Sequence, residues 1–251
     1  MSSSSILQGD DCIAEAQRAA FEDAPAQAAV AVNWPSAESA EGNIMSGSVA
    51  GVNASIRPML PDPTTTFVHV DLLPYEARLD ARPASQVDLV VIHCTELPDL
   101  AMARRYGEEV LYPGSQTGNS GHYYLDRDGA VHQYVSTDRV ANHTRGYNPR
   151  SIGIELVNRG RYPDWLAAGH QAMDEAYTEA QMRSLIALLL QLQTELPALK
   201  VIAGHEDLDT TEVEASDDAN RKVRRKRDPG PLFPWQRVLE AVALERMSAA
   251  T

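Results

Sequence analysis

The chain has 251 residues, of which 43% are hydrophobic and 23% are charged, and its formal net charge at pH 7 is −13. This length fits a globular domain of about 150–200 residues with an extension. The charge excludes a general nucleic-acid binder, because polyphosphate would be repelled over most of the surface. With only two cysteines, Cys12 and Cys94, a disulfide framework is excluded, and any metal must be held mainly by histidine and carboxylate.

The first 60 residues differ in composition from the rest of the chain. They are rich in alanine, serine, glycine and acidic residues, which predicts a poorly ordered or accessory arm. Residues 61–251 are then expected to form the main domain. The start lacks a basic stretch followed by an apolar one, and no apolar run approaches the roughly 18–20 residues of a membrane span. We therefore expect a cytoplasmic protein, or a periplasmic one if a leader preceded this start.

Strand and helix patterns alternate along the domain. Residues 87–93 form a short β-branched run typical of a buried strand, and residues 99–111 read as a helix. Two short strands, 122–125 and 130–135, flank an Asp-Arg-Asp-Gly turn that predicts a hairpin. A strand over 152–157 follows, then a capping box that opens a helix ending near residue 196, a strand over 201–203 and a closing helix over 234–247. The alternation predicts an α/β fold with a central mixed sheet flanked by helices.

Three polar residues stand out at the ends of these patterns. His93 ends one apolar strand, His205 follows another, and Asp228 precedes the rigid turn Pro-Gly-Pro. Two histidines and one carboxylate form a common catalytic zinc set that leaves a fourth position for water. The alternative is that each is a hydrogen-bonded residue at a strand end, and spacing alone does not decide between the two.

Five motifs occur in a fixed order along the chain. They are Val-Val-Ile-His93-Cys-Thr, Gly-His122-Tyr-Tyr-Leu-Asp-Arg-Asp-Gly, Asn-Pro-Arg-Ser-Ile-Gly-Ile-Glu155-Leu-Val-Asn-Arg-Gly, Gly-His205-Glu-Asp-Leu and Lys-Arg-Asp228-Pro-Gly-Pro-Leu-Phe-Pro-Trp. Together they resemble the N-acetylmuramoyl-L-alanine amidase family, which shares its fold with peptidoglycan recognition proteins. The resemblance covers roughly residues 85–245.

The resemblance implies a function and a site. It makes His93, His205 and Asp228 the ligands of one Zn²⁺ per chain, and it makes Glu155 and Lys226 catalytic. The implied reaction is hydrolysis of the amide bond between N-acetylmuramic acid and L-alanine in peptidoglycan or muropeptides, during cell-wall turnover or recycling. The alternative is a non-catalytic peptidoglycan-binding module of the same fold. Neither the preferred fragment nor the oligomeric state follows from the sequence.

These implied roles are chemically coherent. Glu155 would take a proton from water and pass it to the departing nitrogen, and Lys226 would stabilise the tetrahedral oxyanion. For Glu155 the alternative is a surface ion pair. For Lys226 it is a solvated basic face, because the residue lies in the basic run 221–227.

Two further histidines and one insertion depart from the simple pattern. His143 stands in Ala-Asn-His-Thr where the family has Trp-His-Ala-Gly, so a contact with substrate or a purely structural role are both open. His122 is a second candidate for the wall of the substrate cleft. Residues 206–225 are longer than in compact family members, and we expect an insert loop beside the cleft in which acidic and basic residues pair.

Other enzyme classes find little support. The metalloprotease motif HExxH and the nucleophile elbow GxSxG are absent. A thiol enzyme built on Cys94 and His93 is disfavoured, because adjacent strand residues face apart. Nucleic-acid binding through residues 221–227 is disfavoured too, since this run has no interleaved aromatics and an acidic stretch lies just upstream.

Overall fold

The computed structural model describes residues 67–247, so the predicted arm over residues 1–60 lies outside the described residues. Within residues 67–247, a seven-stranded sheet has the strand order β1-β4-β3-β5-β2-β6-β9. Strands β3 and β4 pair antiparallel and the other neighbours pair in parallel. The predicted mixed sheet is confirmed. Its strands are β1 Val68–Val70, β2 Leu89–Cys94, β3 Tyr123–Leu125, β4 Val131–Gln133, β5 Ser151–Leu156, β6 Val201–Gly204 and β9 Glu245–Arg246.

The central strands β2, β5 and β6 lie in register as parallel neighbours. All six residues of β2 are buried, as are five of the six in β5, which explains their nearly continuous apolar sequence. Parallel strands bring their carboxyl ends to one edge of the sheet. The residues that end these strands therefore meet there, although the sequence separates them widely.

The hairpin predicted around the Asp-Arg-Asp-Gly turn is confirmed. Strands β3 and β4 flank it, and the Gly129 amide donates to the Asp126 carbonyl at 2.9 Å. Gly129 has a φ of +89°, a conformation that favours glycine. Its backbone also packs against α3, where an added Cβ would lie 2.9 Å from the Ala180 carbonyl oxygen.

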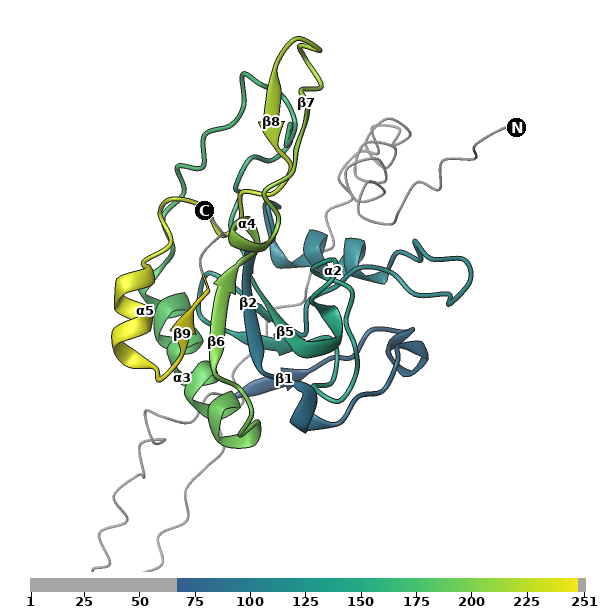
Figure 1. Cartoon of the computed structure of the whole chain (residues 1–251), viewed down its shortest axis with the longest axis vertical. Helices are drawn as coiled ribbons and strands as arrows, with labels where there is room; N and C mark the ends of the chain where they lie inside the picture. The colour runs from purple at the N-terminus through teal and green to yellow at the C-terminus, as the bar shows by residue number, and fades with distance from the viewer. Residues whose placement is uncertain (1–66, 248–251) are drawn as a thin grey trace, which may run out of the picture.

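Helices cover both faces of the sheet, as Figure 1 shows, with α3 (Glu179–Glu195) and α5 (Trp235–Ala241) on one side and α2 (Leu100–Glu108) on the other. Helix α3 begins with the predicted capping box, in which Thr178 and Gln181 each accept from the other's backbone amide. Its buried face shares one core with β2, β5 and β6, and the buried apolar residues of this helix are Met182, Leu185, Leu188, Leu189 and Leu192.

The predicted closing helix over residues 234–247 is wrong in its second half. Helix α5 ends at Ala241, and the backbone is extended at Val242. Val242 and Leu244 are both buried in the core, and this alternation suits a strand. The chain then pairs with β6 as β9. Burial of the two apolar side chains overrides the helical propensity of the intervening residues.

The insert over residues 206–225 is more ordered than the predicted loop. It begins within the short helix α4 (His205–Leu208) and contains a hairpin of β7 (Glu212–Glu214) and β8 (Lys222–Arg224). The register places acidic residues of β7 opposite basic residues of β8, an arrangement that favours pairing. In Figure 1 the hairpin projects beyond α4, away from the main sheet. Between residues 67 and 247, no helix is both long and apolar enough to cross a bilayer.

Candidate metal centre

The ends of β2, β5 and β6 bring the predicted site residues to one edge of the sheet. His93 on β2 is the register partner of Glu155 on β5, which in turn neighbours Tyr124 on β3. Register partners on adjacent strands point to the same face. On the other side of β2, Ile92 pairs with Gly204, and His205 follows directly as the first residue of α4. Sheet register alone therefore sets His93 beside both Glu155 and His205.

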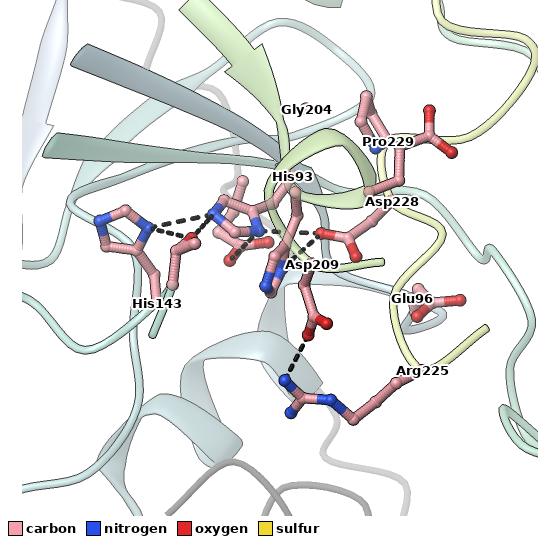
Figure 2. Close-up of polar contacts among 12 residues, drawn as sticks. His93, Glu96, His143, Gly204, Asp209, Arg225, Asp228 and Pro229 are labelled. Carbon is pink, nitrogen blue, oxygen red and sulfur yellow. Dashed lines mark hydrogen bonds and ion pairs between the residues drawn. The ribbon is translucent and has the colours of Figure 1, made fainter. Parts of the chain in front are cut away.

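Asp228 completes a cluster with the two histidines. Its Oδ2 lies 2.8 Å from His93 Nδ1 and 3.2 Å from His205 Nδ1. One ligand atom from each of the three residues lies within 4.8 Å of the others, and all three residues are buried. Figure 2 shows the Asp228 carboxylate turned toward His93, with the residue carried by the segment that leads into Pro229.

The backbone around Asp228 is fixed by two contacts. Its carbonyl accepts a hydrogen bond from the Glu206 amide at 2.9 Å, which ties the segment to α4. Pro229 packs on Gly204, where an added Cβ would lie 2.8 Å from the proline Cδ. A larger residue than glycine at position 204 would therefore push Asp228 away from the histidines.

The electrostatics of the cluster suit a bound cation. Burial by itself opposes ionisation of Asp228, but charge and hydrogen bonds from His205 and His93 outweigh it and hold the pKa of this carboxyl well below its usual range. The group is therefore a carboxylate at neutral pH. Two imidazoles and one carboxylate with converging donor atoms fit the donor set of a tetrahedral divalent metal with one open position.

Glu155 lies at the rim of this cluster. Its Oε1 is 4.0 Å from His93 Nδ1, and burial raises its pKa, an effect that His93 opposes. Gly121 leaves room for the side chain, since a Cβ there would lie 2.8 Å from Glu155 Cγ. A carboxyl group beside the candidate metal, with a raised pKa, has the properties of a general base.

Lys226 lines the same cleft as Glu155 and the three cluster residues. Its positive charge acts on Glu155, where it lowers the pKa against the effect of burial. The structure therefore brings Lys226 to the cleft, although other members of the basic run, such as Arg221 and Lys222, are exposed on the hairpin side.

His143 lies beside His93, as seen in Figure 2. Its Nδ1 is 3.1 Å from His93 Nε2 and 3.0 Å from Thr144 Oγ1. Burial and the neighbouring histidines lower its pKa well below the usual value, so the ring is neutral and suited to accept from His93. His143 also lines the cleft, and a contact with substrate stays a prediction.

His122, the second candidate for the wall of the substrate cleft, lies deep in the fold. Its side chain is fully buried, and it is not among the residues that line the cleft. Its Nδ1 accepts from the Gly153 amide at 3.0 Å, and its Nε2 lies 3.1 Å from the Arg139 carbonyl. Burial and the nearby Arg82 lower its pKa to about 3. His122 thus supports the strands behind the site, and its burial does not favour the predicted contact with substrate.

The thiol alternative loses support as well. Cys94 is buried, and burial together with the charges of Glu96 and Asp228 raises the pKa of its thiol well above the usual value. A thiolate nucleophile needs the opposite environment.

Sequence reasoning missed a buried ion pair beside the site. Arg161 donates to Glu96 through Nε at 2.7 Å and Nη2 at 2.8 Å, and its side chain is 1% exposed. The same guanidinium donates to the carbonyls of Arg224 and Arg225. It therefore ties the end of β2 and the segment after β5 to the chain that carries Lys226. The only sequence signal was its place directly after the motif that contains Glu155.

Replacement of Arg161 by alanine should destabilise the fold by about 3–5 kcal/mol, because it leaves the buried Glu96 carboxylate without its charged partner. Denaturant unfolding monitored by circular dichroism measures this change. The matched control is Arg159→Ala, two residues away and exposed, for which a change within about 0.5 kcal/mol is expected. Equal effects of the two substitutions would contradict a special role for the Glu96–Arg161 pair.

The fold and the site together define a class of protein. It is an α/β domain with a buried histidine–histidine–aspartate cluster, which could hold a metal ion, and a glutamate beside it at one sheet edge. The sequence model of the N-acetylmuramoyl-L-alanine amidase family matches residues 83–231, which is more than half of the chain. The chain belongs to this family, and the resemblance predicted from the five motifs is confirmed.

Known proteins agree with this placement. The chain is 34% identical over 134 residues to the 1,6-anhydro-N-acetylmuramyl-L-alanine amidase AmpD of Salmonella typhimurium (strain SL1344), a match that covers 50% of this chain and 58% of that protein. The chain thus spans little more than half the length of this relative. A crystal structure of a selenomethionine AmpD derivative superposes with a TM-score of 0.51 at 27% identity, over 73% of this chain and 99% of that one. Drosophila peptidoglycan recognition protein SA shares the fold, with a TM-score of 0.51 at 14% identity, over 74% and 97% of the two chains.

Proposed function

We propose that this protein is a zinc-dependent amidase that hydrolyses the bond between N-acetylmuramic acid and L-alanine in peptidoglycan or its muropeptide fragments. The observation that carries the proposal is the buried cluster of His93, His205 and Asp228, whose ligand atoms lie within 4.8 Å of one another. Family membership supports the choice of substrate bond.

The three cluster residues would hold one Zn²⁺. When bound, zinc supplies a Lewis acid that polarises the amide carbonyl and makes water nucleophilic near neutral pH. The Nδ1 atoms of both histidines face Asp228, so they would be the atoms that hold the ion. On the far side of His93, Nε2 lies within hydrogen-bond distance of His143, which would fix the ring orientation and tautomer of the ligand.

Glu155 and Lys226 would carry the proton transfer and the charge stabilisation. Glu155 would accept a proton from the attacking water and deliver it to the alanine nitrogen as the C–N bond breaks. Lys226, which lines the same cleft, would stabilise the negative charge that develops on the carbonyl oxygen. Substrate contact by His143 would come from the wall of the cleft beside the metal ligands.

The alternative is a peptidoglycan-binding module of the same fold without activity. Such a module does not need a general base or a complete ligand set. Here the cluster is complete, and Glu155 lies within 4.0 Å of a cluster histidine. These features favour the enzyme.

Metal removal tests the proposal. The full chain is treated with a chelator, dialysed, and restored with one equivalent of Zn²⁺, and muropeptide products are followed by mass spectrometry. We expect hydrolysis between the muramic acid and L-alanine to fall at least about a hundredfold without metal and to return with zinc, because several kcal/mol of transition-state stabilisation depend on the ion. Undiminished hydrolysis after verified metal removal, or no hydrolysis by the zinc-loaded protein, would reject the proposal.

A further inference from the structure

A second cavity of about 380 Å³ lies beside the cleft, between the β7–β8 hairpin and the segment that contains Ala168 and Gln171. Its walls are held together by hydrogen bonds between side chains and the backbone. The Asp217 carboxylate accepts from the amides of Ala168 and Gly169 at 2.5 and 3.1 Å, and Arg227 Nη1 donates to the Gln171 carbonyl at 2.7 Å. These hydrogen bonds anchor the insert against the domain, so the residues on both sides of the cavity are held in place.

The lining of this cavity is strongly basic in a chain whose formal net charge is −13. Two carboxylates also line it, from Glu206 and Glu212, and its five basic residues are Arg221, Lys222, Arg224, Lys226 and Arg227. Among the described residues, none of these five forms an ion pair with a carboxylate. With five basic and two acidic residues, the lining carries an excess of positive charge, which attracts an anion.

Arg224 gives a second, independent indication. Its Nη2 donates to the carbonyls of Glu206 and Asp209 at 2.6 and 3.1 Å, so these two hydrogen bonds are made to neutral acceptors. Its Nε is buried and has no hydrogen-bond partner within the described part of the chain. A buried donor without a partner is costly, so the hydrogen bonds of this cavity-lining guanidinium are incomplete within the described part of the chain.

Lys226 connects this cavity with the metal centre, because it lines both. A substrate whose scissile amide lies at the His93–His205–Asp228 cluster would therefore extend past Lys226 toward the hairpin. The peptide of a muropeptide continues beyond L-alanine and carries free carboxylates. Its charge and position both match a basic cavity next to the cleft.

We propose that the cavity under the β7–β8 hairpin is a binding site for the carboxylates of the substrate's stem peptide. The inference rests on the proposed function for the identity of the ligand. The insert over residues 206–225 would then act as a specificity element, which selects substrates whose stem peptide is intact and unmodified at its carboxyl groups.

Direct binding tests this inference apart from hydrolysis. The zinc-loaded full chain is titrated calorimetrically with L-alanyl-γ-D-glutamyl-L-lysine and with the same peptide amidated at both free carboxyls. We expect the free acid to bind about tenfold tighter, since charge-assisted hydrogen bonds to carboxylates are lost on amidation. The double variant Arg221→Gln/Lys222→Gln should weaken the free acid about tenfold and leave the amidated peptide unchanged. Both residues are exposed, so the fold should persist.

The matched control is Arg183→Gln/Lys200→Gln, which removes the same charge from exposed positions that line neither cavity. It should bind both peptides as the unsubstituted chain does. The inference is overturned if the free acid shows no binding or no preference over the amidated peptide, or if the two double variants weaken it equally. Hydrolysis of a muramoyl-L-alanine substrate is measured in parallel. Its absence together with carboxylate-selective binding would reject the amidase and keep the cavity assignment, whereas hydrolysis without selectivity would do the reverse.

Discussion

Replacement of Asp228 by asparagine should release the metal and lower hydrolysis at least about a thousandfold, which corresponds to about 4 kcal/mol in the activation barrier. Asparagine keeps the shape of the side chain but removes the negative charge that faces both imidazoles at 2.8 and 3.2 Å. The remaining two histidines form an incomplete donor set for a divalent cation. Metal content after dialysis, measured by mass spectrometry, and product formation from a muropeptide give the two readouts.

The matched control is Asp174→Asn, at an exposed aspartate outside the cleft. It should keep both the zinc and the activity. A substituted Asp228 protein that still held one zinc per chain at unchanged affinity would remove this residue from the ligand set. The histidines would then need another partner.

Glu155→Gln should separate metal binding from catalysis. We expect hydrolysis to fall about a hundredfold to ten-thousandfold, the range for loss of a general base, while one zinc per chain is retained. The reason is geometric, because Glu155 Oε1 lies 4.0 Å from His93 Nδ1 and the residue lies outside the three-residue cluster. Initial rates at saturating muropeptide, together with metal content, test this expectation.

Glu240→Gln is the control for this substitution, since Glu240 is an exposed glutamate on α5. It should leave rate and metal content unchanged. Full activity of Glu155→Gln would remove the proposed base, and it would leave the proton transfer to another group in the cleft. Loss of zinc from Glu155→Gln would instead show that the carboxylate helps to hold the ion.

The two substitutions also distinguish the enzyme from a binding module. In an enzyme, Asp228→Asn and Glu155→Gln both strongly lower turnover but differ in metal content. A module that only binds peptidoglycan has no turnover to lose. In that case Asp228→Asn would change only the metal content, and Glu155→Gln would change neither quantity.

The sequence by itself determined the elements that depend on local patterns. The β-branched runs predicted the central strands, the Asp-Arg-Asp-Gly turn predicted the β3–β4 hairpin, and the Thr178–Gln181 capping box marked the start of α3. Each of these is a short-range signal, and each was confirmed. The ordered motifs determined the family for a similar reason, since they are contiguous strings of residues.

Only the tertiary structure decided which distant residues meet. Parallel register sets His93 beside Glu155. The closeness of Pro229 to Gly204 brings Asp228 to both histidines, and the contact between His93 and Asp228 links residues that are 135 apart in sequence. Tertiary contacts also explain where the structure differs from the sequence predictions. The pairing of β9 with β6 shortened the predicted closing helix, and the packing of the folded chain buries His122. The Glu96–Arg161 pair and the basic cavity were invisible for the same physical reason, because long-range packing and burial depend on the whole folded chain.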